Sequence, residues 1–443
     1  MADTPQLNVV GTSPVRHDGV DKVTGRAIFG VDVALPGMLH ARVLRSPHAH
    51  ARITHIDTSA ADRLPGVAAT VVGTDVPIEP LDGPAAFANP IRLKALNAMA
   101  QGTVMYHGHA VAAVAAVSPH VADEALRHIR VEYEVLTPVV DIPSALAPDA
   151  PILHPDLRME TAGSFADAPS NVAKHLVLEE GDITSGFEMA DVVVERTFST
   201  STVHQGYIEP HNACAFWRSD GTLELHCSSQ GHFGIRNEVS QILGIPISTI
   251  RVVPAEIGGG FGGKLTNYVA IPAVLLAQKS GRPVKMSMDR TETLLATGPA
   301  PAARIRARLG ATKDGRLTAA HLEMHYEAGA FPGSSVGGGA NCGLAPYRLE
   351  NFRVDGYDVV VNKPKSQAYR APGAPQAAFA VESVMDELSD DLGLDPVEFR
   401  LRNASAEGDI RPNGTRFNHV GNIDQMRAAQ SSQHWQAPLP KST

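Results

Sequence analysis

A glycine-rich stretch in the middle of the chain, GGGFGGK, constrains the fold more than any other segment. It places five glycines within seven residues, from Gly258 to Lys264. Glycines at this density remove side chains, so that a backbone can approach a ligand closely and direct its N–H groups at anions or oxygens. The stretch therefore predicts a binding loop, although a tight turn that only packs a strand against a helix also uses glycines.

The residues before the loop predict a strand, a helix and a second strand. Residues 223–229 alternate apolar and polar side chains like a half-buried strand. Residues 231–243 have helical spacing, and Gly244 follows where a helix ends. The second strand, 250–257, leads into the glycines. Because another turn, at Gln230, ends the first strand, we expect a ligand site rather than a packing turn.

A nucleotide phosphate is the first candidate ligand. The loop fits the G-x-x-x-x-G-K part of a P-loop, but Leu265 occupies the position of the magnesium-binding Ser or Thr. Phe261 would also crowd a phosphate cradle. The sequence therefore disfavours a P-loop.

Composition excludes several function classes. The 443 residues suggest roughly three domains. A net charge of −9 without a basic run argues against nucleic acid as a partner. Cys214, Cys227 and Cys342 are too scattered for a disulfide framework, a zinc site or an iron–sulfur cluster, so we expect buried, reduced thiols. Since neither a signal peptide nor an apolar run of about 18 residues is present, we expect a cytoplasmic chain without a membrane span.

Residues 25–140 predict a small mixed α/β domain. A helix opened by Ser118 and Pro119 joins two strands in a β-α-β unit. The predicted strands are 39–44, 52–57, 66–72, 109–117 and 130–136.

Four histidines of this region raise the question of a metal site. They lie on separate elements or alternate across strands, so we favour hydrogen-bonded or solvated side chains. These residues are His48, His50, His107 and His109.

Residues 141–170 are rich in Pro, Ala and Asp and predict a linker. The region that follows, 171–403, alternates predicted strands and helices and indicates an α+β domain. Within it, Lys313-Asp314-Gly315 predicts a hairpin turn, and residues 376–392 predict a helix.

Three segments, in this order, resemble the molybdopterin-contacting segments of the molybdenum hydroxylases, the xanthine dehydrogenase and aldehyde oxidase family. They are SSQG at 228–231, GGGFGGK at 258–264 and AYRAPGAPQ at 368–376. The flanking sequences YIEPHNACAFW and LDPVEFRLRN are also similar, and the resemblance covers about residues 9 to 409.

The resemblance implies an α+β fold, in which an N-terminal α/β hammerhead domain precedes a mixed α+β molybdopterin-binding domain. The implied boundaries are an N-terminal arm at 1–24, the hammerhead domain at 25–140, a linker at 141–170, the first molybdopterin-binding domain at 171–403 and a C-terminal tail at 404–443.

The resemblance also implies a site around molybdenum, which is held through the pterin near Gln230, Phe261 and Arg370. An amide such as that of Gln230 donates to an oxygen of the metal centre without adding charge. The charge of Arg370 favours oxyanions, although by itself it also suits a surface or ion-paired arginine. We expect Glu209 to be structural rather than a general base. The implied cofactor-binding residues are Gln230, Gly231, Gly260, Phe261, Gly262 and Arg370.

Departures from the family pattern narrow the substrate. Purine hydroxylases carry a glutamate where this chain has Leu265, and a phenylalanine where it has Pro372. Carbon monoxide dehydrogenases carry a cysteine where this chain has Ala371. We therefore place Leu265 and Pro372 in the substrate pocket and expect an aldehyde or an N-heteroaromatic compound.

The resemblance stops before a second molybdopterin domain, as in the large subunits of split nicotinate dehydrogenases. It implies a small-molecule hydroxylase that takes its oxygen from water and shares a molybdenum–molybdopterin cofactor, in a dinucleotide form, with a second molybdopterin-domain subunit. That partner would carry the base glutamate, so no catalytic residue is expected in this chain. Electrons would pass to an iron–sulfur subunit and an FAD subunit. The alternative is a truncated or non-catalytic fragment or scaffold of the same fold.

Overall fold

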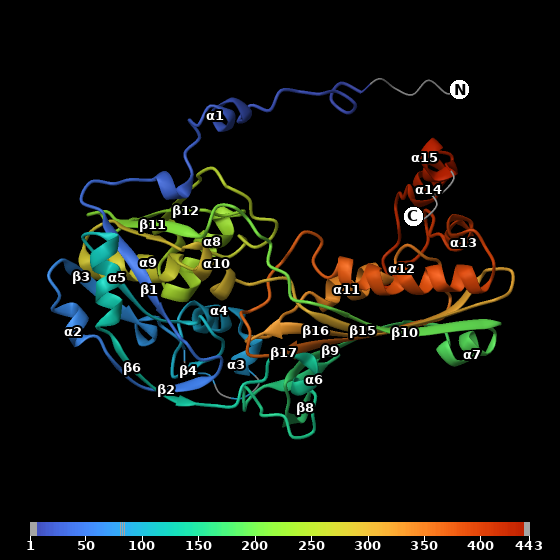
Figure 1. Cartoon of the computed structure of the whole chain (residues 1–443), viewed down its shortest axis with the longest axis horizontal. Helices are drawn as coiled ribbons and strands as arrows, with labels where there is room; N and C mark the ends of the chain where they lie inside the picture. Colours follow the sequence, from blue (N-terminus) through green and yellow to red (C-terminus); the bar gives the residue numbers. More distant parts are fainter. Residues whose placement is uncertain (1–6, 80, 82, 84, 438–443) are drawn as a thin grey trace, which may run out of the picture.

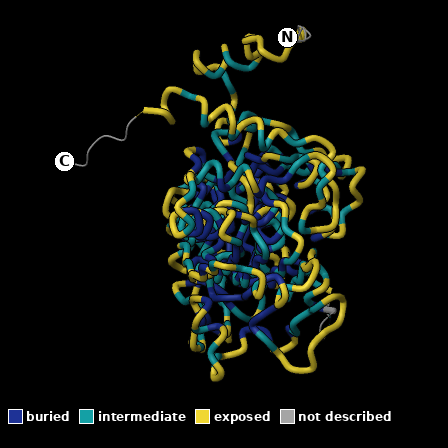
Figure 2. Tube along the Cα trace, turned by 90° about the vertical axis from the view of Figure 1, so that its right-hand side faces the viewer, coloured by how far each residue is buried: buried dark blue, intermediate teal, exposed yellow. Residues whose placement is uncertain are grey.

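The computed structural model describes residues 7–437 apart from residues 80, 82 and 84. Within these residues the chain forms two large β-sheets that lie side by side, with helices on their faces (Figure 1). Residues 7–27 extend from this body as a largely exposed arm, whereas buried residues concentrate in the body (Figure 2). The fold is α+β, as predicted.

The first sheet combines strands from both halves of the chain. In the described residues its order is β13-β12-β11-β14-β1-β5-β3, and β1 pairs in parallel with β14. The strands of the region expected as a separate hammerhead domain thus continue into the sheet that carries the glycine loop. Its strands are β1 (Leu39–Arg45), β3 (Val67–Val72), β5 (Ala110–Ala116), β11 (Asn212–Trp217), β12 (Leu223–Cys227), β13 (Ile250–Val253) and β14 (Val284–Ser287).

Strand β5, with the sequence AVAAVAA, forms the most buried part of this sheet. On one side Ala113 and Ala115 share a core with α9 (Ala270–Ser280). On the other side Ala112 and Val114 pack with α5 (Pro119–Arg127). Because helices cover both faces, the strand carries no alternating polar residues.

The expected β-α-β unit is wrong in its pairing, although its three elements form. Strand β6 (Arg130–Val135) does not join β5 but pairs antiparallel with β2 (Ala51–Asp57) in a small sheet completed by β4 (Thr103–Val104). Its sequence RVEYEV alternates charged and apolar residues, which suits a strand with one face in solvent and not the middle of a covered sheet.

The second sheet is built from the longer strands. Its order in the described residues is β10-β15-β16-β17-β9-β7-β8, and the predicted hairpin at Lys313–Gly315 is confirmed by the antiparallel pairing of β15 with β16. Helices α11 (Val336–Gly343) and α12 (Ala374–Asp391) lie along one face, and α7 (Ile183–Glu188) lies on the other (Figure 1). The strands are β7 (Arg158–Thr161), β8 (Ser164–Pro169), β9 (Val172–Glu180), β10 (Val192–Thr200), β15 (Ala303–Ala311), β16 (Leu317–Gly329) and β17 (Phe352–Val360).

Residues 141–170, which the sequence analysis expected as a linker, contain regular structure. A short helix, α6 (Ile142–Ala145), precedes β7 and β8, which form the edge of the second sheet. Strand β8 is exposed along its whole length. An exposed edge strand needs few apolar side chains, which explains why its composition resembles that of a linker.

Helix ends follow the local signals. Gly244 closes α8 with a φ of 65°, and the Ser118 hydroxyl caps α5 by accepting from the Val121 N–H. The other helices are α1 (Gly19–Val23), α2 (Ser59–Asp62), α3 (Ala85–Ala88), α4 (Pro90–Ala98), α7 (Ile183–Glu188), α8 (His232–Leu243), α10 (Arg290–Ala296), α11 (Val336–Gly343), α12 (Ala374–Asp391), α13 (Pro396–Asn403), α14 (Asn422–Gln430) and α15 (Gln433–Gln436), and short 3-10 turns occur at Gly30–Asp32, Gly73–Asp75 and Ile247–Thr249.

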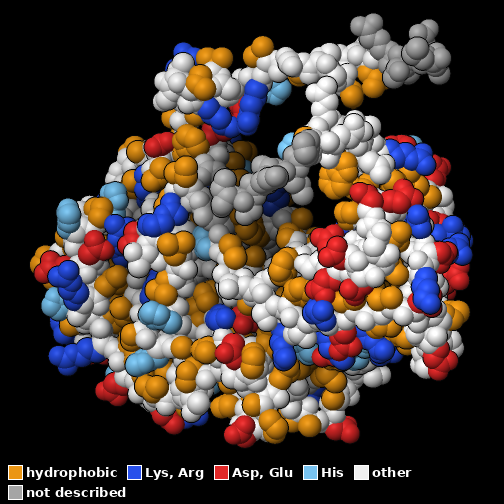
Figure 3. All heavy atoms as spheres, turned by 45° about the vertical axis from the view of Figure 1, so that its right-hand side comes forward, with side chains coloured by type: hydrophobic (Ala, Val, Ile, Leu, Met, Phe, Trp, Pro, Cys, Tyr) orange, Lys and Arg blue, Asp and Glu red, His pale blue; other side chains and the backbone are white. Residues whose placement is uncertain are grey.

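One of the three cysteines is exposed, whereas the sequence analysis expected buried thiols. Cys214 and Cys227 are buried, but Cys342 is exposed, because it lies on the side of α11 that does not face the core. Acidic and basic side chains are intermixed on the face shown in Figure 3. In the described part of the chain, no helix is both long and apolar enough to cross a bilayer.

Candidate functional site

The glycine loop and Gln230 lie at the same edge of the first sheet. The loop follows β13, Gln230 follows β12, and these two strands are parallel neighbours. The side-chain oxygen Oε1 of Gln230 accepts hydrogen bonds from the Gly262 N–H (2.8 Å) and the Lys264 N–H (3.1 Å). Since Oε1 is engaged, Nε2 is left as the donor, and no residue in the described part of the chain accepts from it. The role of this amide as a donor to the cofactor stays a prediction.

Two glycines of the loop are required by close neighbours. A Cβ on Gly260 would lie 2.6 Å from Oε1 of Gln230, and a Cβ on Gly262 would lie 2.6 Å from the Ala368 carbonyl oxygen. Gly262 also has a φ of +103°, which other residues rarely adopt. The loop therefore packs directly against the two other segments that the sequence analysis singled out.

The third segment is joined to the loop through its backbone. The Arg370 N–H donates to the Phe261 carbonyl oxygen (2.8 Å). Phe261 (φ 53°) and Ala371 (φ 64°) both have left-handed backbones, which cost free energy in residues with a side chain. Such strain concentrates at ligand sites. The structure thus brings Gln230, Phe261 and Arg370 together, and Gly231 and Gly260 lie within the same segments.

The loop carries polar groups without described partners, and we call its side next to Phe261 and Arg370 the outer face. The N–H groups of Gly259, Gly260 and Phe261 have no hydrogen-bond acceptor in the described part of the chain. Arg370 is exposed and forms no ion pair with any described residue. Unpaired donors at one place form a concave site for oxygens or anions.

On the side of the loop that we call the inner face, Lys264 and Glu209 form a buried ion pair. Lys264, whose side chain is fully buried, lies with Nζ 2.7 Å from Oε2 of Glu209. The same carboxylate accepts from the N–H of Gly258 (2.8 Å) and, through Oε1, from the Asn212 amide (3.0 Å). Glu209 therefore ties the first and last residues of the loop together. This arrangement matches the expected structural role of Glu209, whereas the role of Lys264 was not predicted.

His211 lies behind this ion pair and is fully buried. Burial, together with the positive charge of Lys264, lowers the pKa of His211 to about 3. Burial also lowers the pKa of Lys264, while Glu209 acts in the opposite direction. The base of the loop thus holds one paired charge and one neutral imidazole.

A cavity of about 620 Å³ opens beside Phe261 and Arg370, and we call it the Arg370 cavity. Pro372 also lines it. Four other lining residues have a buried polar atom without a hydrogen-bond partner among the described residues: Thr200 Oγ1, Gln205 Oε1, Ser335 Oγ and Gln376 Oε1. Buried polar atoms are almost always paired in native proteins, so these four atoms are available to a polar ligand or to water in the cavity.

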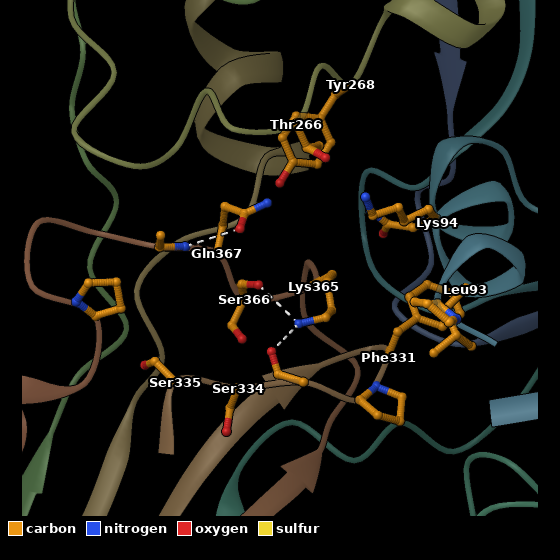
Figure 4. A pocket seen from close by; sticks show the side chains of 16 residues that line it. Leu93, Lys94, Thr266, Tyr268, Phe331, Ser334, Ser335, Lys365, Ser366 and Gln367 are labelled. Carbon is orange, nitrogen blue, oxygen red and sulfur yellow. Dashed lines mark hydrogen bonds between the residues drawn. The ribbon is translucent and has the colours of Figure 1, made fainter. Parts of the chain in front are cut away.

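A second cavity, of about 410 Å³, lies on the other side of Pro372 and Ser335, which line both cavities. We call it the Lys365 cavity, after the lysine whose ammonium group points into it (Figure 4). Its apolar walls include Leu93, Tyr268 and Phe331. Leu265, predicted in the substrate pocket, lines neither cavity and is half exposed, although the next residue lines the Lys365 cavity.

The site residues that were predicted have local sequence motifs, whereas the residues that were missed do not. The loop, Gln230 and Arg370 stand in recognisable local motifs. Glu209 and Lys264 are far apart in sequence, and no local pattern pairs them. Lys365 likewise has no motif of its own.

The histidines of the N-terminal region do not gather. His50 Nδ1 lies 3.0 Å from the Thr137 carbonyl oxygen, and His109 Nε2 lies 2.9 Å from that of Leu96. Within residues 7–437, less the three left out, no three His, Cys, Asp or Glu side chains converge as metal ligands.

Two family models match the chain. Residues 165–404 match the molybdopterin cofactor-binding domain, and residues 24–137 match the a/b hammerhead domain of aldehyde oxidase and xanthine dehydrogenase. Together the two matches cover most of the chain.

Similar proteins differ in how much of their length the chain covers. It is 35% identical over 426 residues to the nicotinate dehydrogenase large molybdopterin subunit of Eubacterium barkeri, covering 95% of both chains. It is 34% identical over 410 residues to the xanthine dehydrogenase molybdenum-binding subunit of Escherichia coli O157:H7, covering 90% of this chain and 52% of that one. The structure of quinoline 2-oxidoreductase from Pseudomonas putida 86 superposes with a TM-score of 0.82 at 28% identity, covering 95% of this chain and 53% of that one. The chain thus spans about half the length of these last two proteins and nearly all of the first.

Proposed function

The chain belongs to the xanthine dehydrogenase and aldehyde oxidase family of molybdenum oxidoreductases, and we propose that it binds the molybdopterin cofactor within a heteromeric hydroxylase. The observation that carries the proposal is the outer face of the glycine loop. There Gln230, Phe261 and Arg370 meet beside a cavity in which four buried polar atoms have no partner among the described residues.

The residues present fit an oxygen-rich, anionic cofactor. The amide Nε2 of Gln230 and the free N–H groups of the loop are donors without competing acceptors among the described residues. The Arg370 guanidinium supplies a positive charge that no described carboxylate neutralises. When bound, the molybdenum cofactor supplies the two-electron oxidation and the water-derived oxygen that hydroxylation requires. In this proposal the residues of the chain hold and orient it, in a dinucleotide form shared with a partner subunit.

The proposal assigns the base to a partner chain. No described carboxylate lines the Arg370 cavity or the Lys365 cavity. Glu209 contacts the glycine loop directly, but its oxygens are held by Lys264, Gly258 and Asn212. A side chain tied in this way cannot move toward a substrate without breaking a buried ion pair, which is costly. The base glutamate is therefore proposed on a second molybdopterin-domain subunit, and the iron–sulfur and FAD centres on further subunits.

The proposed substrate is an aldehyde or an N-heteroaromatic compound. The similar proteins support this range, since their names include nicotinate dehydrogenase and quinoline 2-oxidoreductase. Pro372, which lines both cavities, is the residue of this chain that we place against the substrate.

The test is to purify the chain alone and after co-expression with its genomic neighbours. We expect molybdenum and pterin at about one per complex only in the co-purified material, together with oxidation of aldehydes or N-heterocycles by an artificial dye. Absence of molybdenum from both preparations, with no stable partner, would contradict the proposal and leave a scaffold without turnover.

A further inference from the structure

Lys365 has an unusual position among the lysines near the Lys365 cavity. Lys94, on the opposite wall, forms an ion pair with Glu238 at 2.8 Å. Lys363 forms one with Glu327 at 2.8 Å. Lys365 has no carboxylate within 4.0 Å in the described part of the chain. It is therefore the lysine at this cavity whose charge is not neutralised.

The ammonium group of Lys365 is held in place by carbonyl oxygens. Its Nζ donates to the carbonyl oxygens of Gly333 (2.6 Å) and Ser366 (3.1 Å), as Figure 4 shows. An ammonium group has three N–H donors, so one remains for a ligand. The nearest acidic side chain that affects Lys365, Asp358, is itself engaged by the N–H groups of Gly333 and Ser334, both at 2.7 Å. The positive charge therefore faces the cavity with no carboxylate of the described residues in direct contact, while Asp358 interacts favourably with it from a longer distance.

The rest of the cavity defines the partner of this charge. Leu93, Tyr268 and Phe331 provide apolar walls for a flat ring. One ammonium group with a free N–H donor, set between apolar walls, suits a ring that carries a single carboxylate. Pro372 and Ser335 form the boundary with the Arg370 cavity, where the cofactor is proposed to bind.

We propose that Lys365 selects substrates that carry a carboxylate, so that the enzyme acts on an aromatic or heteroaromatic monocarboxylic acid whose ring lies toward Pro372. This inference rests on the proposed function, because it takes the Lys365 cavity as the place where the substrate binds. It adds a specificity residue that no sequence motif indicates.

The test compares acids with their neutral carboxamides on the co-purified complex. Pyridine-3-carboxylate is paired with pyridine-3-carboxamide, and 4-carboxybenzaldehyde with 4-formylbenzamide, and both calorimetric binding and dye-linked oxidation are measured. We expect the wild-type complex to prefer the acid. The Lys365→Met substitution should weaken binding of the acid about 10- to 100-fold, the range of a hydrogen bond to a charged group, and change binding of the amide by less than about 3-fold.

Two control variants separate charge from packing. Lys365→Arg keeps the charge and should retain most of the preference for the acid. Lys94→Met/Glu238→Gln removes the paired lysine of the same cavity together with its carboxylate, and should leave the ratio of acid to amide within about 3-fold. An unchanged ratio in Lys365→Met, or no preference in the wild type, would overturn the inference.

The pH dependence gives an independent readout. Burial lowers the pKa of Lys365 to about 8, and Asp358 acts in the opposite direction. Lys365 is therefore charged at pH 7 and loses its charge as the pH rises through about 8. We expect kcat/KM for the acid, but not for the amide, to fall above about pH 8, and the fall to disappear in Lys365→Arg. Lys94, the other charged group at the cavity, is paired with Glu238 at 2.8 Å.

The binding and activity results distinguish the inference from the function on which it rests. A complex that binds the acid through Lys365 but oxidises neither compound would contradict the proposed function and support the role of Lys365. A complex that oxidises the acid and the amide equally well would support the proposed function and contradict the role of Lys365.

Discussion

The inner and outer faces of the glycine loop differ in burial, in ion pairing and in hydrogen bonding. On the inner face, Lys264 and Glu209 are buried, paired and hydrogen-bonded to both ends of the loop. On the outer face, Phe261 and Arg370 are exposed, and the backbone donors lack described partners. The loop is thus satisfied where it meets the core and unsatisfied where it meets the cavity.

This contrast teaches how a strained loop can serve as a binding site. Left-handed backbones at Phe261 and Ala371 would relax unless the surrounding contacts held them. The ion pair at the base, the Gln230 bonds and the Arg370–Phe261 bond provide those contacts. Stability and binding therefore depend on different residues of the same seven-residue segment, which mutations can separate.

The largest effect is expected from breaking the inner face. Lys264→Met leaves the buried carboxylate of Glu209 without its counter-ion, which costs about 3–5 kcal/mol of unfolding free energy. Chemical denaturation of the purified variant measures the loss. The double variant Glu209→Gln/Lys264→Met removes both charges and should recover part of the stability. A loss below about 1 kcal/mol in Lys264→Met would show that the pair does not hold the loop.

A smaller effect on stability, and a larger one on binding, is expected at the contact between loop and Gln230. In Gly260→Ala the new methyl group would lie 2.6 Å from Oε1 and 2.9 Å from Cγ of Gln230. Relief of this overlap displaces the amide at a cost of about 1–3 kcal/mol and should lower molybdenum content in the co-purified complex.

Gly234→Ala is the matched control, because a Cβ there meets no atom within 4 Å and the position lies inside α8. It should raise stability by up to about 1 kcal/mol and leave molybdenum content unchanged. Equal molybdenum content in the Gly260 and Gly234 variants would mean that Gln230 is not a cofactor contact.

The smallest effect concerns His211 on the inner face. Because its folded pKa of about 3 lies below the unfolded value near 6.5, the unfolded chain takes up a proton as the pH falls below 6.5 and the folded chain does not. Lowering the pH from 7.5 to 5.5 should therefore cost about 1.4 kcal/mol through this residue. Unfolding free energies of the wild type and His211→Phe across this range measure the difference. An identical pH dependence in both proteins would exclude the contribution.

Most of the fold was accessible from the sequence because its signals are local. Alternating apolar residues, Gly244 and the Lys313–Gly315 turn located strands, a helix end and a hairpin that the structure confirms. Strand pairing was not accessible in the same way. The parallel pairing of β1 with β14 joins residues far apart in sequence, and no local pattern carries that information, whereas the alternation of RVEYEV in β6 does indicate a strand outside the covered sheet.

The residues of the site also divide into those with a local sequence signal and those without one. Gln230, the glycine loop and Arg370 belong to short motifs, and the structure brings them together. Lys264 and Lys365 acquire their roles from partners distant in sequence, Glu209 in one case and the Gly333 carbonyl in the other. The exposed Cys342 was missed because whether a cysteine is buried depends on which side of α11 faces the core.

The most direct test of the central claim is the molybdenum content of the co-purified complex with Arg370→Met, measured beside its unfolding midpoint. Arg370 is exposed and unpaired among the described residues, so its loss should leave the unfolding free energy within about 0.5 kcal/mol. We predict an intact fold with strongly reduced molybdenum relative to the wild-type complex. Full molybdenum content in this variant would contradict the claim that the outer face of the loop holds the cofactor.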